Sequence, residues 1–405
     1  MDLTFGQAVQ KEVLRLAAEG KDTNQIAKIV CDQDPKGYNY GIGIMLDGNG
    51  QPMSSSPTLL EYTHTELDNS RYGNYMSSTS LMNDLTMAIL QWQRIPKIYQ
   101  EHFTLLLPSD AGTGAVRTAI ETALLLHPNL NTLGAEELGW PVYKSIAKVV
   151  RIGYKEFGDD GIMAEQGLLP VYQAGPMNPT GQVRHPKVIA ARAKTAAEQY
   201  TFVVLDRAYS GFEYARLLAT HSYDEIMRIS YEQQIKPFIE RKVPFALALS
   251  PTKSFVSFAL RPCGLLLLFS PDLSKKQETT HITNIILRAR GSSFEHPTTR
   301  AFVKAMIHDS GRLEAEHRIA LERVAAAETL WRKLAQGTNI EYQFSDEYAG
   351  LFRNPKTWKD ASTHIYNEHL YPVFSNNRCR QNITGIPDNE EIAHRHVTVF
   401  AEHCY

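Results

Sequence analysis

The stretch VPFALALSPTKSFVSFALRPCGLLLLFS, residues 243–270, places an apolar run on each side of a mixed loop. In the runs 243–250 and 264–270 nearly every residue is apolar, without the alternation of a strand that has one wet face. Continuous apolarity over a short run is typical of strands that are buried on both faces. The stretch therefore predicts two buried strands, and Lys253, directly after the first, needs a way to tolerate a low dielectric.

Further apolar runs precede this stretch, at 102–108 (HFTLLLP), 169–174 (LPVYQA) and 200–206 (YTFVVLD). Polar segments that suit helices lie between them. Buried strands that alternate with helices form a mostly parallel sheet, because a parallel neighbour needs a long crossover connection. The sequence therefore predicts an α/β fold.

The pattern changes at SGRLEAEHRIALERVAAAETLWRKLAQG, 310–337, where apolar residues recur near helical spacing and a glycine ends the segment. We expect this long helix to link a large domain, 51–309, to a smaller C-terminal domain, 310–405. The N-terminal segment, 1–50, has a helical and then a turn-rich pattern. We expect it to pack with the smaller domain.

Charge and cysteine content narrow the class of protein. The 405 residues include 42 basic and 44 acidic ones without blocks of one sign, which argues against nucleic acid or a membrane surface as a partner. The four cysteines lie far apart without a CxxC pair, so we expect a reducing compartment and no metal site. HRH (394–396) lacks a ligand pattern and is expected on a strand surface. No export signal or membrane span is expected, which favours a cytoplasmic enzyme.

The helix expected after HFTLLLP opens with AGTGA, 111–115. Small residues let backbone N–H groups approach an anion at a helix N-terminus, so Gly112 and Thr113 are candidates for a phosphate site. An ordinary strand-to-helix turn explains the same residues. Neither a Walker A motif nor GxGxxG is matched, and in GIGIML (41–46) Leu46 replaces the third glycine, which disfavours a nucleotide-binding module.

Two more polar signals follow later strands. Asn178 lies in MNPTG (177–181), where the next proline restricts its backbone and can direct its amide into a cleft. Asp206 ends the run VVLD, and Tyr209 follows three residues later. A carboxylate at a buried strand end is costly unless a cation or strong donor faces it. A plain Asn-Pro turn and a helix-capping aspartate are the alternatives.

The opening stretch supplies the fourth signal. Ser250, Thr252 and Lys253 follow the first run, and Arg261 lies eight residues after the lysine. Hydroxyls and an arginine suit a phosphate, and a lysine is an amine nucleophile. A solvated loop is the alternative. All four signals fall at the ends of predicted strands, where open α/β sheets bind their ligands.

In chain order, AGTGA, Trp140 in GWPVY, NPTG, DxAYxGF and SxTK with an arginine eight residues later resemble the fold-type I pyridoxal-phosphate aminotransferases of class I, in particular the aspartate and aromatic aminotransferases. The resemblance runs from about Tyr40 to Gly385. It implies a three-layer α/β/α large domain, a smaller α+β domain and pyridoxal 5'-phosphate as cofactor. It also implies a homodimer that shares its active sites across the interface.

The resemblance also implies residue roles. Lys253 matches the lysine that holds the cofactor as a Schiff base and moves a proton between substrate and cofactor. Asp206 matches the partner of the pyridine nitrogen, Tyr209 and Asn178 match donors to the phenolic oxygen, and Trp140 matches the aromatic that stacks on the ring. Lys253, Asp206 and Tyr209 are thus the expected catalytic residues.

The cofactor phosphate has its own expected set of ligands. These are Ala111, Gly112, Thr113, Ser250, Thr252 and Arg261. Ala111 stands where relatives often have serine or glycine, so it offers a backbone donor without a hydroxyl. A tyrosine of the partner subunit also reaches this phosphate in the family; we expect Tyr75 in this role, with Tyr72 as the alternative.

Substrate recognition in the family depends on two arginines. Arg380, in the pattern Arg, one residue, Asn, two residues, Gly, matches the arginine that binds the substrate α-carboxylate, with Arg378 as the rival. Arg288 matches the arginine that binds the side-chain carboxylate across the dimer interface, whereas Arg290 is expected to be a solvated neighbour. Gly43 is expected to leave room above the substrate, which Trp140 and Asn178 also face.

One residue departs from the family pattern. Tyr143 stands where relatives usually have a histidine that supports the pyridine-nitrogen aspartate, although a phenol can still donate a hydrogen bond to Asp206. The leading hypothesis is an aminotransferase that moves the amino group of an aspartate, glutamate or tyrosine type of L-amino acid to a 2-oxo acid such as 2-oxoglutarate. The alternatives are a lyase or decarboxylase with the same cofactor, and a weakly catalytic cofactor-binding regulator.

Overall fold

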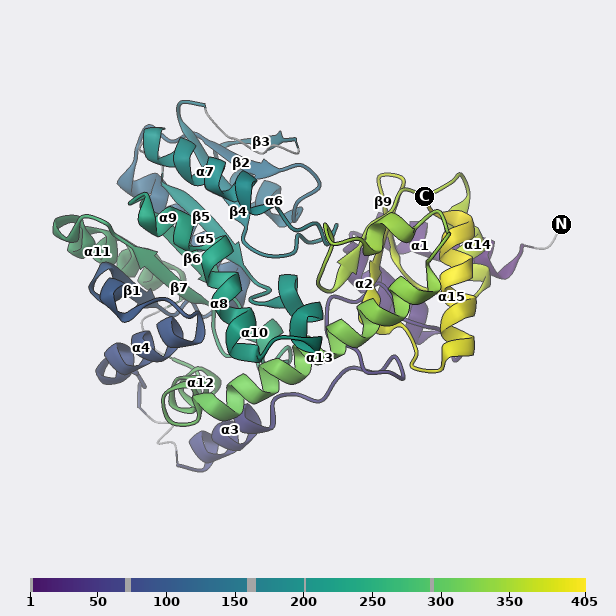
Figure 1. Ribbon diagram of the computed structural model, residues 1–405, viewed down its shortest axis with the longest axis horizontal. Coiled ribbons are helices and arrows are strands. Elements are labelled where there is room, and N and C mark those ends of the chain that lie inside the picture. Colours follow the sequence, from purple (N-terminus) through teal and green to yellow (C-terminus); the bar gives the residue numbers. More distant parts are fainter. Residues whose placement is uncertain (1–2, 70–73, 159–164, 200–201, 292–294) are drawn as a thin grey trace.

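A seven-stranded sheet forms the centre of the protein, seen here in a computed structural model that describes residues 3–69, 74–158, 165–199, 202–291 and 295–405 (Figure 1). Its order is β1-β7-β6-β5-β4-β2-β3. The strands are β1 (Phe103–Leu106), β2 (Thr132–Glu136), β3 (Gly153–Phe157), β4 (Leu168–Gln173), β5 (Val203–Arg207), β6 (Phe245–Leu249) and β7 (Leu265–Phe269). β7 pairs antiparallel with β6 and β1, and the pairs of β2 with β3 and β4, of β4 with β5 and of β5 with β6 are parallel. The predicted mostly parallel sheet is confirmed.

Helices cover both faces of this sheet, which explains the continuous apolarity of its strands. In β6, Ala246 and Ala248 belong to a core that includes residues of α5 (Ala111–Leu126) and α6 (Val142–Val150). Leu247 and Leu249 belong to a second core, with residues of α7 (Pro186–Gln199) and α8 (Tyr223–Gln234). Because successive strand residues face opposite ways, two covered faces require an apolar residue at every position. The three layers are those expected.

The same part of the chain contains further helical segments. They are α3 (Pro57–Asn69), η1 (Thr79–Leu81), α4 (Met82–Trp92), η2 (Lys97–His102), η3 (Phe212–Ala219), α9 (Lys236–Glu240), α10 (Pro251–Ser254), α11 (Leu273–Gly291) and α12 (Pro297–His308). The predicted long helix is α13 (Ser310–Leu334), which runs from beside α12 to the opposite end of the molecule (Figure 1).

The remaining elements gather around the far end of α13 (Figure 1). β8 (Phe352–Arg353), β10 (Arg378–Asn382) and β9 (Val373–Ser375) form an antiparallel sheet in that order. The helical segments here are α1 (Phe5–Ala18), α2 (Thr23–Asp32), η4 (Glu341–Phe344), α14 (Ala361–Asn367), η5 (Ile383–Gly385) and α15 (Glu390–His403). α1 packs against α14, so the N-terminal segment contacts the C-terminal part. The domain boundaries at 50 and 309 stay predictions.

One expectation about the C-terminal part is wrong. HRH (394–396) lies in α15 rather than on a strand, and His396 is buried with its Nδ1 2.9 Å from the Tyr40 hydroxyl. Three residues are too few to separate a helical period from strand alternation.

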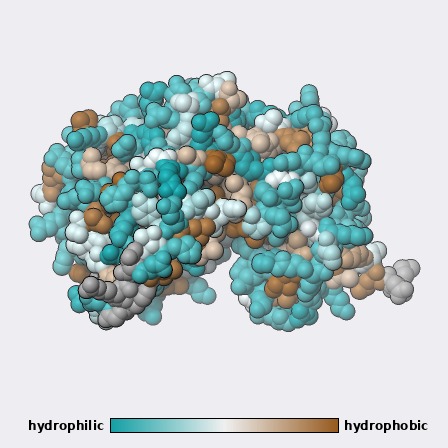
Figure 2. Space-filling model, turned by 90° about the horizontal axis from the view of Figure 1, so that it is seen from below, coloured by the Kyte–Doolittle hydropathy of each residue, from teal (hydrophilic) through white to brown (hydrophobic). Residues whose placement is uncertain are grey.

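The face seen in Figure 2 is mostly hydrophilic with scattered apolar patches, and a notch separates the larger from the smaller part. Within the described ranges, no helix is long and apolar enough to cross a membrane.

Candidate active site

The carboxyl ends of β4, β5 and β6 surround a cavity of about 310 Å³. Gln173, Asp206 and Ser250 stand at or directly after those ends. Every residue expected on this chain to bind the cofactor lines the cavity, except Tyr75: Ala111, Gly112, Thr113, Trp140, Asn178, Asp206, Tyr209, Ser250, Thr252, Lys253 and Arg261. Val116, Gln173, Ala208 and Phe258 also line it. The sheet topology thus brings together residues that are far apart in the sequence, from Ala111 to Arg261.

Lys253 lies in the short helix α10, one turn after the buried strand β6. Burial lowers the pKa of its ammonium to about 8; the Asp206 carboxylate opposes this shift and Arg261 adds to it. Its Nζ lies 5.2 Å from the centre of the Phe258 ring. A lysine with this pKa has an appreciable fraction of neutral amine near neutral pH, as a nucleophile or a general base requires.

Asp206 is the buried carboxylate of the cavity. Burial raises its pKa to about 6, while hydrogen bonds from Tyr143 and from the Ala208 backbone and the charge of Lys253 lower it. The Tyr143 hydroxyl donates to Oδ2 at 2.6 Å, and the Ala208 N–H donates to Oδ1 at 3.2 Å. With these donors, Asp206 is mostly ionised at neutral pH and able to face a positive group.

Tyr143 comes from the first turn of α6 and is buried. Burial, and next the Asp206 carboxylate, raise its pKa well above that of free tyrosine, so it keeps its proton and can only be the donor in this bond. Its ring meets the Trp140 ring edge to face at 5.3 Å. The expected hydrogen bond between Tyr143 and Asp206 is therefore present.

Small residues and hydroxyls form one end of the cavity. The hydroxyls of Ser250 and Thr252 lie 2.7 Å apart, and Gly112, in the first turn of α5, lies beside Ser250. A Cβ added to Gly112 would lie 2.8 Å from the Ser250 Cβ. Only glycine therefore fits here, where the helix N-terminus and Arg261 also favour an anion.

Asn178 lines the cavity, and one polar atom of its side chain is buried there. Its backbone N–H donates to the Gln173 side chain at 3.0 Å, while its buried Oδ1 has no hydrogen-bond partner among the described residues. The Gln173 Nε2 is likewise buried and unpartnered in the described ranges. Such atoms cost free energy unless a ligand or water meets them, so they mark a binding site.

Gln173 was missed at the sequence level, although it ends the apolar run before NPTG. Its backbone N–H donates to Glu136 at 3.0 Å, and Arg184 and Arg192 donate to the same buried carboxylate at 2.8 and 2.9 Å. This ion cluster holds the end of β4 under Asn178. A polar residue at the carboxyl end of a buried strand is the signal that would have found Gln173.

Arg380 and Gly43 lie outside the lining of this cavity. The Arg380 Nη2 donates to the Gly41 carbonyl at 2.6 Å, and burial lowers the pKa of its guanidinium, while the nearby Tyr209 hydroxyl and Asp22 oppose the shift. The rival, Arg378, donates to the Asn354 carbonyl at 2.9 Å. Of the two arginines, Arg380 is thus the one that interacts electrostatically with Tyr209, which lines the cavity.

The residues expected to act across a dimer lie apart from the cavity. Tyr75 is 76% exposed, and Tyr72 lies outside the described residues. Arg288 is exposed at a second cavity, of about 510 Å³. Their predicted roles need a second chain and stay predictions.

The prediction that Arg290 is a solvated neighbour is wrong. Its side chain is 15% exposed, forms an ion pair with Asp110 and donates to the Thr118 hydroxyl. Spacing along α11 could not show this, because Asp110 precedes α5 and Thr118 lies within it, and α5 packs beside α11.

The residues of the first cavity fit pyridoxal phosphate. The Lys253 amine and the Asp206 carboxylate interact electrostatically in the cavity. The end of the cavity that is formed by Gly112, the two hydroxyls and Arg261 suits a phosphate. The orphaned Asn178 oxygen and Gln173 amide leave polar capacity for a ligand in the cavity.

Comparisons with known proteins agree with this geometry. Residues 39–333 match the family aminotransferase class I and II. Among solved structures, the chain is similar to an aromatic amino acid aminotransferase from Burkholderia pseudomallei covalently bound to pyridoxal phosphate (TM-score 0.77, 16% identity, covering 94% of this chain and 97% of that one). It is also similar to a broad-specificity aminotransferase from Leishmania mexicana (TM-score 0.77, 17% identity, covering 94% of this chain and 95% of that one). A third similar structure is the cytoplasmic aspartate aminotransferase from Saccharomyces cerevisiae (TM-score 0.72, 15% identity, covering 94% of this chain and 97% of that one). Compared by sequence with curated proteins, the chain matches none.

Fold and site thus define an aminotransferase with a class I architecture. The chain belongs to the aminotransferase class I and II family. The predictions of the family, of a transferase that acts on amino groups and of pyridoxal phosphate as cofactor are confirmed at this level.

Proposed function

We propose that this aminotransferase moves the amino group of a dicarboxylic or aromatic L-amino acid to a 2-oxo acid such as 2-oxoglutarate, with pyridoxal phosphate bound at Lys253. The observation that carries this proposal is the pairing of a buried lysine with a pKa of about 8 and a buried aspartate in one cavity that ends in a phosphate cradle. When bound, the cofactor supplies an aldehyde and a ring that withdraws electrons from the substrate Cα.

The residues of the chain would divide the remaining tasks. The phosphate would be held by Gly112, Ser250, Thr252 and Arg261. The Asp206 carboxylate would accept a hydrogen bond from the protonated ring nitrogen. The Lys253 Nζ, once free, would take the proton from the substrate Cα, because a neutral amine is present near its pKa of about 8.

Two arginines support the substrate class. Arg380 is close enough to Tyr209 to interact with it electrostatically, so a carboxylate bound by its guanidinium would lie beside the cavity. Arg288 is exposed, as a residue that serves the active site of a partner subunit must be before assembly. We propose a homodimer on this ground, and a cytoplasmic location because the four cysteines are buried free thiols.

A donor panel tests the proposal. Protein reconstituted with pyridoxal phosphate is incubated with 2-oxoglutarate and L-aspartate, L-tyrosine or L-phenylalanine, and with L-glutamate and a different 2-oxo acid, and the new 2-oxo and amino acids are quantified by mass spectrometry. We expect transfer from at least one donor. Lys253→Ala should lower the rate about a thousandfold or more, because it removes the amine that moves the proton.

Lys275→Ala, which changes an exposed lysine on α11, is the matched control and should keep the wild-type rate. Transfer by Lys253→Ala at that rate would contradict the assigned role. Release of ammonia or carbon dioxide without transfer would favour the lyase or decarboxylase alternative. No turnover on any donor would favour the regulator.

A further inference from the structure

Phe352 lies where the small sheet meets the candidate active site. The Arg380 guanidinium carbon lies over its ring, 4.8 Å from the ring centre. The Tyr209 ring meets it edge to face at 6.3 Å, and a Cβ built on Gly43 would lie 3.8 Å from its Cζ. One aromatic ring thus contacts or borders three residues that were expected to face the cofactor or the substrate.

The guanidinium that this ring covers has unused hydrogen-bonding capacity. Arg380 Nη2 donates to the Gly41 carbonyl and to the Asn24 side chain. Its Nε is buried and has no hydrogen-bond partner among the described residues. A buried N–H of a charged group without a partner is costly, so it indicates a place for an anionic ligand.

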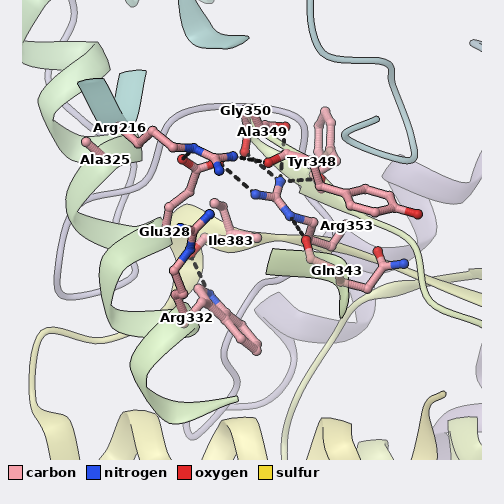
Figure 3. Close-up of polar contacts among 12 residues, drawn as sticks. Arg216, Ala325, Glu328, Arg332, Gln343, Tyr348, Ala349, Gly350, Arg353 and Ile383 are labelled. Atoms are coloured by element: carbon pink, nitrogen blue, oxygen red, sulfur yellow. Dashed lines mark hydrogen bonds and ion pairs between the residues drawn. The ribbon is translucent and has the colours of Figure 1, made fainter. Parts of the chain in front are cut away.

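Arg353, the next residue along the chain, anchors the segment that carries Phe352, and Figure 3 shows its polar contacts. Arg353 is almost fully buried and forms a 2.7 Å ion pair with Glu328 of α13. Its other N–H groups donate to the carbonyls of Gln343, Ala349, Gly350 and Phe352, at 2.6 to 3.1 Å. A single side chain therefore ties the loop before β8 to α13.

Arg216 contacts the same loop from another direction (Figure 3). It belongs to η3, which follows the segment with Asp206 and Tyr209. It donates to the Tyr348 carbonyl and to Asp346. The loop before β8, and with it the backbone of Phe352, is thus held from both sides.

We propose that Phe352 is a substrate-positioning residue, whose ring, held by the Arg353 anchor, orients the Arg380 guanidinium for the α-carboxylate of the substrate. The proposal rests on the proposed function, since Arg380 binds a carboxylate only if the substrate carries one there. A ring over the guanidinium face leaves the in-plane N–H groups free, and those are the groups that a carboxylate accepts from. The ring also excludes water from the face of the charge, which strengthens the ion pair.

The test compares Phe352→Leu with Phe400→Leu. Phe400 is equally buried in the small-domain core, where it contacts Tyr40 and Trp331, and serves as the matched control for loss of a ring. Calorimetry measures the binding of succinate and of 3-phenylpropionate, two carboxylates without an amino group, to each holoenzyme. We expect Phe352→Leu to weaken binding about threefold to thirtyfold, the range for a lost cation–π contact, and Phe400→Leu to leave it unchanged.

Kinetics provide a second measurement. With Phe352→Leu we expect a KM that rises by a similar factor with a smaller change in kcat, and an unchanged affinity for pyridoxal phosphate. Phe352→Met, which keeps most of the volume, replaces the leucine variant if that variant does not fold. Wild-type carboxylate affinity in the Phe352 variants, equal losses in Phe400→Leu, or no carboxylate binding by the wild type would overturn the proposal. A wild-type protein that binds carboxylates but transfers no amino group would instead overturn the proposed function alone.

Discussion

The hydroxyl of Tyr143 donates a 2.6 Å hydrogen bond to Oδ2 of Asp206, and both side chains are buried. This bond joins the first turn of α6 to the end of β5. It supplies a donor that stays protonated, because burial and the carboxylate raise the pKa of the phenol well above its ordinary value. Asp206 thus has a hydrogen-bond donor that stays protonated, in addition to the charge of Lys253.

Tyr143→Phe should impair the cofactor site without unfolding the protein. Loss of the bond removes an interaction that lowers the pKa of Asp206, so this pKa should rise above about 6, by roughly one to two units for a charged hydrogen bond. We expect weaker binding of pyridoxal phosphate at pH 7 and recovery of binding at higher pH. Fluorescence titration of the apoprotein across pH measures both.

Tyr143→His tests the same idea in the other direction, since an imidazole can also donate to the carboxylate. It should bind the cofactor more tightly than Tyr143→Phe at pH 7. Equal affinity in the wild type and Tyr143→Phe at every pH would mean that the phenol does not influence Asp206.

Covalent uptake of the cofactor should depend on the titration of Lys253. Its amine is the nucleophile only when neutral, and burial lowers its pKa to about 8. Between pH 6 and 8 the rate of uptake by the apoprotein should rise about tenfold per pH unit and then level off. Below pH 6 it should fall more steeply, because Asp206, with a pKa of about 6, becomes protonated as well.

Borohydride trapping followed by mass spectrometry of the peptide that contains Lys253 measures this rate. Lys253→Ala is the control and should show no trapped cofactor. A rate that does not change between pH 6 and 9 would contradict the lowered pKa of the lysine.

Gly112→Ala should weaken cofactor binding through sterics alone. The new Cβ would lie 2.8 Å from the Ser250 Cβ, which cannot rotate away because it is attached directly to the backbone. Ser250 and the start of α5 must then separate, and the phosphate cradle opens. We expect at least a tenfold loss of pyridoxal phosphate affinity, measured by equilibrium dialysis.

Gly311→Ala is the matched control, because a Cβ there meets nothing within 4 Å in α13. Replacing glycine by alanine in an open helical position stabilises by about 0.5 to 1 kcal/mol, so cofactor affinity should stay unchanged while the free energy of unfolding rises slightly. Wild-type cofactor affinity in Gly112→Ala would place the phosphate elsewhere.

Arg353→Met should destabilise the small sheet strongly. It leaves the buried Glu328 carboxylate without its Arg353 partner (Figure 3), which lies at 2.7 Å, and deprives several carbonyls of a donor. Breaking a buried ion pair costs about 3 to 5 kcal/mol. Chemical denaturation should show this loss in the free energy of unfolding.

Arg332→Met serves as the comparison, because Arg332 of α13 pairs with the exposed Asp346 and its own side chain is 48% exposed. Its loss should cost less than about 1 kcal/mol. If Arg353→Met also lowers the free energy of unfolding by less than about 1 kcal/mol, the buried pair contributes little. If the loss is large, adding Glu328→Leu to Arg353→Met should recover part of it, because the unpaired buried carboxylate is then removed.

The sequence by itself determined the sheet, the long helix and most of the residues that line the cavity. The apolar runs required strands buried on both faces, and a mostly parallel sheet brings the ends of such strands to one edge. Lys253, Asp206 and Asn178 could therefore be placed together without coordinates. The roles of Arg288 and Tyr75 stay predictions, because they concern a second chain.

Only the tertiary structure decided which side chains meet. It paired Arg290 with Asp110 across 180 residues, left the Gln173 amide at the cavity without a partner in the described ranges, and set the Phe352 ring under the Arg380 guanidinium. Such contacts depend on the rotation and distance of elements that are remote in sequence, whereas strand burial is a local property of composition. The hydrogen bond from Tyr143 to Asp206 joins the two levels: the phenol was visible in the sequence, and the packing of α6 against the sheet set its 2.6 Å distance.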